Sequence, residues 1–380
     1  MVLHICGKDL LPIVQGGMGV GVSAHRLAGT VAEAGALGTI SSVDLRRHHA
    51  DLMAATGRSR DKGGIDAANL VALDREIRAA RERSGGRGLI AVNVMRAVSE
   101  YAPYVRQACA SGADAIVVGA GLPLDLPDLM ADYPHVALIP ILSESRAVGL
   151  VLKRWMRKNR LPDAIIVEHP RYAGGHLGAA RLEDLADPRF DFERVVPEIL
   201  ALFDELKIER VRIPVIVAGG INSPERVQRA LATGASGVQV GTAFAVTAEG
   251  DAHPEFKRVL AEAGPEDIVT FMSVAGLPAR AVRTPWLQQY LEREASRMRR
   301  ARERLCVVGA DCLAQCGLRD GISRMGQFCI DHHLAAALRG DLKHGLFFRG
   351  SEPVPFGAAI RPVRALIDHL LCAPSAVAAP

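Results

Sequence analysis

One recurring local pattern constrains the fold of this chain more than any other feature. Three stretches repeat it: a helix end closed by glycine, a short apolar run, and then a turn of small residues. They are residues 32–42 (AEAGALGTISS), 110–121 (ASGADAIVVGAG) and 232–244 (ATGASGVQVGTAF). Repeated helix-to-strand units of this kind are typical of a parallel βα architecture.

Eight short apolar runs rich in β-branched residues follow one another along the chain, and each predicts a buried strand. They span residues 12–15, 37–41, 89–93, 115–118, 136–142, 164–167, 214–218 and 237–241.

The segments between these runs have helical patterns. Residues 69–83 form one example, and another begins after Ser223, which can cap a helix that has Pro224 in its first turn. Eight strands alternating with helices match a (β/α)8 barrel, whose usual size is ~250 residues. A doubly wound open sheet is the alternative, but GMGVGV (residues 17–22) lacks the third glycine of a dinucleotide-binding turn. We therefore predict an α/β fold, a (β/α)8 TIM barrel with a C-terminal helical extension.

The composition excludes several classes of protein. The net charge of +4 is spread along the chain and only 4% of the residues are aromatic, which argues against a nucleic-acid partner. No apolar run approaches the ~20 residues that cross a membrane, and residues 1–10 lack a signal-peptide pattern. We therefore expect a cytoplasmic protein without a membrane partner, whose seven cysteines are reduced. The oligomeric state stays open, with a homodimer as one option.

The ends of the seventh and eighth predicted strands are rich in glycine. In TIM barrels the active site lies at the carboxyl ends of the strands, and the loops after the last two strands often hold a phosphate group. Glycines there let backbone N–H groups approach phosphate oxygens. We therefore predict a phosphate site at Gly219, Gly220, Gly241 and Thr242. The alternative is that these turns only close their strands.

The ends of the first and third predicted strands favour a flat ligand. Gly16 and Gly17 would let a ring lie against the backbone, and the Met18 thioether offers polarizable packing. Asn93 can donate and accept hydrogen bonds at a heteroaromatic edge. Either feature alone fits an ordinary turn, but together with a phosphate site they favour a phosphorylated flavin such as FMN.

Four motifs in this order resemble the nitronate monooxygenase family, formerly called 2-nitropropane dioxygenases. They are PIVQGGMG (residues 12–19), AGGHLG (173–178), IVAGGI (216–221) and GVQVGTAF (237–244). Relatives of that family include FMN-dependent NADH:quinone reductases and flavin enoyl-acyl-carrier-protein reductases. The motifs are specific for the superfamily and much less specific for the substrate.

The resemblance implies a TIM barrel that holds FMN without a covalent bond. It places next to the flavin ring Gly16, Gly17, Met18, Asn93 and Gly175, and around the ribityl phosphate Gly219, Gly220, Gln239, Gly241 and Thr242. Some relatives have a flavin-contacting lysine after the fifth strand. This chain has no lysine there, and we expect Ser143 to take its place.

The resemblance also places His176, in EHPRYAGGHLG (residues 168–178), over the flavin face. An imidazole there can act as a base toward a neutral nitroalkane or, when protonated, can hold the oxygens of a nitronate. We therefore expect His176 to be catalytic and to contact substrate; the alternative is a loop histidine bonded to a carbonyl group. Residues 273–280 resemble another family segment, and we expect Ser273 to contact substrate. His169 is expected to support the loop, and the role of Glu168 stays open.

The tail of the chain is expected to be helical. We place an FMN-binding barrel at residues 1–285 and a C-terminal helical subdomain, packed near the barrel mouth, at residues 286–380. Cys312 and Cys316 would share one face of a helix, and Cys329 can join them in a metal or iron–sulfur site. Neither spacing is C-x-x-C, and cysteine is often buried as a small hydrophobic residue. We therefore expect no metal site, and the roles of these cysteines and Cys306 stay open.

Three functional hypotheses follow. The first is an FMN-dependent oxidoreductase of the nitronate monooxygenase type, which converts a small nitronate and O2 into a carbonyl compound and nitrite. The second keeps FMN, with NAD(P)H as its reductant and a quinone or an enoyl thioester as its oxidant. The third is a barrel that binds a phosphate ligand without catalysis.

Overall fold

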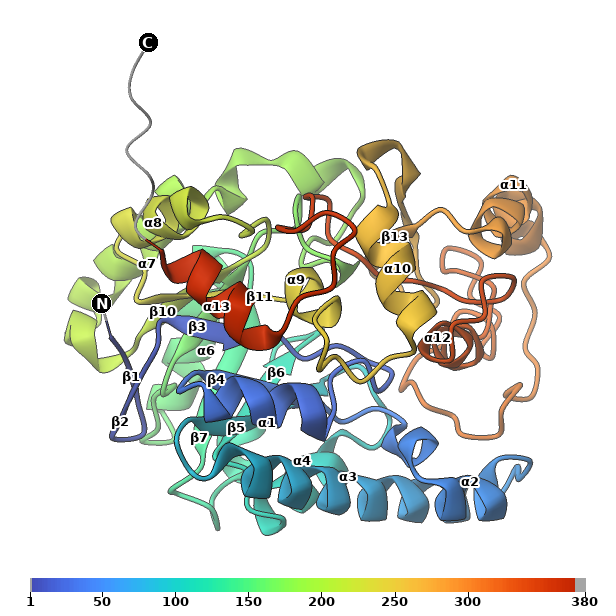
Figure 1. The fold of residues 1–380 in the computed structure, drawn as a ribbon, viewed down its shortest axis with the longest axis horizontal. Coiled ribbons are helices and arrows are strands. Elements are labelled where there is room, and N and C mark those ends of the chain that lie inside the picture. The colour runs from blue at the N-terminus through green and yellow to red at the C-terminus, as the bar shows by residue number, and fades with distance from the viewer. Residues whose placement is uncertain (1, 373–380) are drawn as a thin grey trace.

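Eight parallel strands close into a barrel in the computed structural model, which describes residues 2–372 (Figure 1). Their order around the barrel is β10-β11-β3-β4-β5-β6-β7-β8. The strands are β3 (Ile13–Gln15), β4 (Leu37–Ser41), β5 (Leu89–Met95), β6 (Ala115–Gly119), β7 (Ala137–Leu142), β8 (Ile165–Glu168), β10 (Val215–Ala218) and β11 (Gly237–Val240). Each predicted run forms one barrel strand, and the TIM-barrel prediction is confirmed.

Helices cover the outside of the barrel. Ser223 caps α8 as expected, because its hydroxyl accepts a hydrogen bond from the Arg226 backbone N–H at 3.3 Å. The helices are α1 (His25–Glu33), α2 (Ala50–Thr56), α3 (Lys62–Ser84), α4 (Tyr101–Ala110), α5 (Leu126–Leu129), α6 (Ser145–Met156), α7 (Phe192–Glu205), α8 (Pro224–Ala232), α9 (Thr242–Ala245), α10 (Pro254–Glu262), α11 (Pro285–Arg299), α12 (Ile330–Leu338) and α13 (Val363–Leu371).

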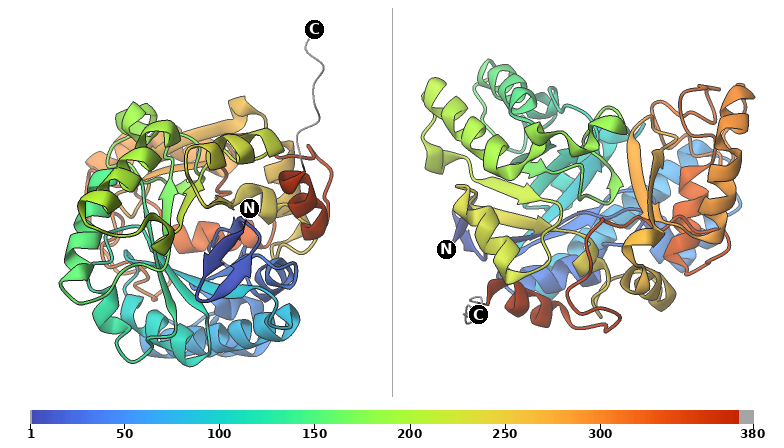
Figure 2. Two further views of the ribbon diagram at one scale, coloured as in Figure 1. Left: turned by 90° about the vertical axis from the view of Figure 1, so that its left-hand side faces the viewer. Right: turned by 90° about the horizontal axis from the view of Figure 1, so that it is seen from above.

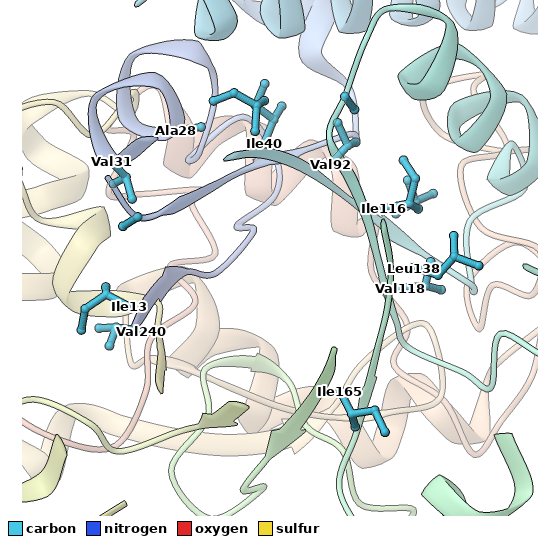
Figure 3. Packing of buried hydrophobic residues seen from close by; sticks show 14 of the residues in the cluster. Ile13, Ala28, Val31, Ile40, Val92, Ile116, Val118, Leu138, Ile165 and Val240 are labelled. Carbon is cyan, nitrogen blue, oxygen red and sulfur yellow. The ribbon is translucent and has the colours of Figure 1, made fainter. Parts of the chain in front are cut away.

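Successive side chains along each barrel strand pack alternately in two hydrophobic layers, as expected for strands that are buried on both faces. On β5, Ile90 and Val92 pack in the layer between strands and helices, whereas Leu89 and Ala91 pack in the barrel interior. Figure 3 shows the layer between strands and helices, where residues of several strands lie beside residues of α1. Both layers together fix the strand ends, which carry the predicted site.

A small hairpin that the sequence pattern did not reveal belongs to the interior layer. It consists of β1 (Leu3–Ile5) and β2 (Lys8–Leu10), which pair antiparallel. Leu3, Ile5 and Leu10 pack with the residues of the barrel interior. The left view of Figure 2 shows this hairpin in front of the barrel.

A separate antiparallel sheet holds the loop with the two glycines and the histidine. Its strands are β9 (Gly175–His176), β12 (Ile268–Met272) and β13 (Pro278–Val282). His176 pairs with Ala279, and Gly175 pairs with Arg280. Backbone pairing of a distant hairpin therefore fixes a loop that would otherwise be free to move.

The helices after β13 lie against the barrel in two regions. At the mouth, α12 lies beside the barrel with α11 farther out, whereas α13 packs against α8 and α1 on the barrel wall (Figure 1). The boundary expected at residue 286 stays a prediction, and residues 373–380 of the expected subdomain lie outside the described residues. Within residues 2–372, none of the helices combines the length and the apolar character needed to cross a membrane.

Candidate active site

A cavity of about 580 Å³ opens at the carboxyl ends of the barrel strands. The ends of β3, β5, β7, β8, β10 and β11 contribute to it, together with the loop around β9 and the chain after β13. The site residues predicted from the sequence that line it are Gly16, Gly17, Met18, Asn93, Ser143, Gly175, His176, Gly219, Gly220, Gln239, Gly241 and Thr242.

Among the described residues, Ser273 is the one predicted site residue that does not line the cavity. It is fully buried in the turn between β12 and β13. Its hydroxyl accepts a hydrogen bond from the Ala275 backbone N–H at 3.2 Å, and its own N–H donates to the Leu277 carbonyl at 2.9 Å. Ser273 therefore stabilises the turn, and its predicted contact with substrate is not supported.

The wall formed by β3 and β5 has no room for a side chain at Gly17. A Cβ atom there would lie 2.4 Å from Cβ of Asn93, closer than real Cβ contacts. At Gly16 a Cβ atom would lie 3.4 Å from the side chain of Gln239 on β11. Glycine at position 17 therefore lets the ends of β3 and β5 approach each other, whereas a Cβ atom at Gly16 would make only an ordinary contact. Together the two glycines leave a smooth backbone surface.

The loops after β10 and β11 bring the predicted phosphate residues together. Gly219 and Gly220 have φ values of +105° and +76°, which favour glycine. Thr242 is the first residue of α9, and its hydroxyl accepts a hydrogen bond from the Gly350 N–H at 3.0 Å. The C-terminal part of the chain thus contacts the predicted phosphate site, a connection that no sequence pattern indicated.

His176 has the chemistry of a neutral imidazole. Burial alone lowers the pKa of its ring from 6.5 to about 4, because the charged form would lose its hydration. The ring contacts Phe348 edge to face, with centroids 5.6 Å apart. Its Nε2 atom is buried and has no hydrogen-bond partner among the described residues. Since buried polar atoms are usually paired, Nε2 is suited to bind a molecule in the cavity.

Glu168 is a second titratable group in the cavity wall, whose role the sequence left open. Burial raises the pKa of its carboxyl to about 7, and the positive charge of Arg280 offsets only part of this effect. Arg280 is itself buried and donates hydrogen bonds to the carbonyl oxygens of Pro170 and Ala173. The cavity therefore holds two proton-binding side chains whose pKa values are displaced in opposite directions.

His169 has a supporting position, as the sequence predicted. It is 2% exposed, and its Nε2 lies 3.1 Å from a carboxylate oxygen of Asp191. Its Nδ1 accepts a hydrogen bond from the Arg171 backbone N–H at 3.2 Å. Both ring nitrogens are thus used within the loop, in contrast to those of His176.

Several cavity residues from the end of the chain escaped the sequence analysis. Phe348, Arg349 and Gly350 line the wall next to the loop of β9. A Cβ atom at Gly174 would lie 2.5 Å from backbone atoms of Arg349 and Gly350, so the two segments pack backbone to backbone. The only local signal was an aromatic pair between glycines (GLFFRG, residues 345–350), which is equally common in ordinary cores.

Solved structures with this fold cover nearly the whole chain. FabK from Thermotoga maritima superposes with a TM-score of 0.65 at 24% identity, covering 95% of this chain and 91% of that one. A nitroalkane oxidase from Streptomyces ansochromogenes has a TM-score of 0.63 at 21% identity, covering 95% and 94%. At these identities the likeness shows the fold alone.

Sequence comparisons are more specific about the family. A probable nitronate monooxygenase of Bacillus subtilis is 31% identical over 125 residues, and one of Staphylococcus saprophyticus is 27% identical over 129 residues. These matches span about a third of this chain and a third of the relatives. The model of the nitronate monooxygenase family matches residues 7–371. The chain therefore belongs to the nitronate monooxygenase family of oxidoreductases.

Proposed function

We propose that this protein is an FMN-dependent enzyme that oxidises small alkyl nitronates with O2, giving a carbonyl compound and nitrite. The observation that carries the proposal is the state of His176: a neutral ring in the cavity wall whose Nε2 has no partner among the described residues. Membership of the nitronate monooxygenase family supports this choice of reaction.

The residues of the cavity fit FMN. The backbone at Gly16 and Gly17 would receive the flat ring, with Met18, Asn93, Ser143 and Gly175 around it. The phosphate would bind at the turns after β10 and β11, with the residues Gly219, Gly220, Gln239, Gly241 and Thr242. Bound FMN supplies the redox chemistry, whereas the protein supplies placement and electrostatics.

His176 would act on the substrate in its neutral form. A ring with a pKa of about 4 is uncharged at neutral pH. One ring nitrogen can then accept a proton from the α-carbon of a neutral nitroalkane, and an N–H can donate a hydrogen bond to an oxygen of a nitronate. The apolar ring of Phe348, which meets the imidazole edge to face, would help to keep water away from the His176 ring.

Glu168 would assist in the handling of protons. A carboxyl group whose pKa is about 7 exchanges its proton readily near neutral pH. Because it lines the same cavity, it would take over the proton that His176 accepts from a neutral nitroalkane. This role is a proton-holding one, secondary to that of His176.

An anaerobic stopped-flow comparison tests the proposal. The FMN-loaded protein is mixed with propionate 3-nitronate in one experiment and with NADH in another, and the flavin absorbance is followed. We expect the nitronate to reduce the flavin and NADH to leave it oxidised on the same timescale. Fast bleaching by NADH without any reaction with the nitronate would favour the NAD(P)H-dependent reductase instead. A purified protein that neither contains nor binds FMN would exclude both enzymes.

A further inference from the structure

Three arginines are buried among the described residues, and their positive charges are compensated to different degrees. Arg46 forms an ion pair with Asp44 at 2.8 Å. Arg280 feels the charge of Glu168 and donates to two carbonyl oxygens, as described above. Arg349 is only 2% exposed, and it takes part in none of the ion pairs between described residues. Because buried charges are usually paired, this guanidinium calls for a partner.

Two carboxylates influence Arg349, but both are bound to other groups. Burial lowers the pKa of the Arg349 guanidinium, and the negative charges of Asp267 and Glu352 offset this effect only in part. Asp267 accepts a hydrogen bond from the Gly264 N–H at 2.9 Å, and Glu352 forms an ion pair with Arg226 at 2.5 Å. The charge of Arg349 therefore has no direct anionic partner among residues 2–372.

Two hydrogen bonds hold the Arg349 guanidinium in place. Its Nε donates to the Leu260 carbonyl oxygen at 2.8 Å, and its Nη1 donates to the Gly350 carbonyl oxygen at 3.0 Å. These bonds use two of the five N–H groups that a guanidinium has. The group is thus oriented by the protein and keeps donors for a ligand.

Arg349 is also exceptional within the wall of the cavity. Among the described residues of that wall, only Arg189 and Arg349 carry a permanent positive charge. Arg189 lies 3.4 to 3.5 Å from carboxylate oxygens of Glu144, Asp184 and Asp187, so its charge is already compensated. Arg349 therefore supplies the positive charge with which this wall can bind an anion.

Hydrogen bonds connect Arg349 to the predicted phosphate site. Gly350, whose carbonyl oxygen accepts from the Arg349 guanidinium, donates its own N–H to the Thr242 hydroxyl at 3.0 Å. Farther along the chain, the Asn222 side chain donates to the Pro353 carbonyl oxygen at 2.8 Å. Thr242 follows β11, and Asn222 lies in the turn after β10. The segment that carries Arg349 is thus bonded to the chain after both strands.

A phosphate monoester is the anion that this arrangement fits. The glycines at positions 219, 220 and 241 let backbone N–H groups approach oxygen atoms, but they bring no full positive charge. A phosphate monoester carries more than one negative charge at neutral pH. A guanidinium binds its oxygens through charge-assisted and often bidentate hydrogen bonds. Arg349 therefore complements what the glycine turns provide.

We propose that Arg349 is a phosphate-binding residue, whose guanidinium pairs with the phosphate group of the ligand in this cavity. That this ligand is FMN rests on the proposed function, whereas the anion site follows from Arg349 and its neighbours alone. The sequence did not single out this residue, because 108 positions separate Gly350 from Thr242 and only the fold brings the two together.

Binding of FMN and of riboflavin, which lacks the phosphate, tests the proposal. The flavin-free protein is titrated with each compound, and flavin fluorescence gives the two Kd values. Arg349→Gln should raise the Kd for FMN at least about tenfold, because a hydrogen-bonded charge is lost, and should leave the Kd for riboflavin nearly unchanged. Arg324→Gln, at an exposed position, is the control and should change neither value.

The ratio of the two Kd values decides the outcome. An unchanged Kd for FMN in Arg349→Gln, or an equal loss of affinity for FMN and riboflavin, overturns the proposal. Arg349→Met is a second variant in case the first does not fold. Because it replaces an unpaired buried charge by an apolar chain, we expect a folded protein, and it should lose affinity for FMN alone.

Failure of the proposed function would give a different result. A protein that binds FMN but does not react with a nitronate contradicts the proposed reaction, and the two Kd values still test Arg349. A protein that binds no flavin contradicts the proposed function as a whole, and thermal unfolding with inorganic phosphate then tests the anion site. Stabilisation by phosphate in the wild type but not in Arg349→Gln supports the site, whereas equal stabilisation or none in either protein overturns it.

Discussion

The ring of His176 meets the ring of Phe348 edge to face, with their centroids 5.6 Å apart and their planes at 62°. The contact joins the loop of β9 to the chain that follows α12. An aromatic ring in this position covers the imidazole without offering it a hydrogen bond. We therefore expect the lowered pKa of His176 to depend on a segment far away in the sequence.

Phe348→Ala should raise the pKa of His176. Water would reach the imidazole, and the pKa would move from about 4 toward the value of 6.5 that an exposed histidine has. Because the neutral ring is the proposed active form, kcat/KM should fall as the pH drops through this pKa, and the acidic limb of the pH profile should shift to higher pH. Phe348→Leu, which keeps an apolar cover, should shift the limb much less. An unchanged limb in the alanine variant would refute the role of Phe348.

Gly17→Ala should impair flavin binding. The added Cβ would collide with Asn93 at 2.4 Å and displace the strand ends that would receive the ring. We expect the Kd for FMN to rise at least about tenfold, which corresponds to ~1.4 kcal/mol of binding free energy, and the FMN content of the purified protein to fall. Gly63→Ala on α3, where the new atom meets only an ordinary contact at 3.5 Å, is the matched control. Equal FMN content in the two variants would contradict the placement of the ring.

Glu168→Gln should stabilise the flavin-free protein at neutral and higher pH. The folded state holds the carboxyl proton up to a pKa of about 7, compared with 4.5 in the unfolded chain, so stability is lost as the pH rises through this window. The variant removes that loss, which amounts to at most about 3 kcal/mol because one pKa unit is worth ~1.4 kcal/mol.

Urea unfolding at pH values below 4.5 and above about 7, the two pKa values of Glu168, measures the effect of Glu168→Gln. We expect a gain in the free energy of unfolding at about pH 8 and almost none at about pH 4. Glu82→Gln, at an exposed position on α3, serves as the control. A gain of the same size at both pH values would mean that the pKa of Glu168 is not displaced.

The barrel could be predicted from the sequence because its signals are local. Each strand is a short apolar run of β-branched residues, and Ser223 before Pro224 marks the start of α8. Glycines at the ends of β3, β10 and β11 indicated where a ligand could approach the backbone. All of these features can be recognised from residues that are close together in the sequence.

The remaining parts of the site depend on contacts between distant segments. The sheet that fixes His176 forms between β9 and β13, and two paired residues in β9 are too short a signal to recognise in a sequence. Ser273 looked functional through its motif, but its neighbours in the β12–β13 turn already satisfy its hydroxyl. Phe348 acquires its surroundings only when the tail folds back onto the barrel mouth. The helix expected around Cys312 and Cys316 is absent, because residues 300–329 form no helix or strand.

Steady-state kinetics of His176→Asn with nitroethane, a neutral nitroalkane whose α-proton must be removed to give the nitronate, tests the central claim most directly. Asparagine keeps a polar side chain in the loop but cannot act as a base at this position. The account predicts that FMN stays bound while turnover falls by about 100-fold or more, the usual contribution of acid–base catalysis. His135→Asn, at an exposed position outside the cavity wall, should leave turnover unchanged. Near-normal turnover of FMN-loaded His176→Asn would contradict the account.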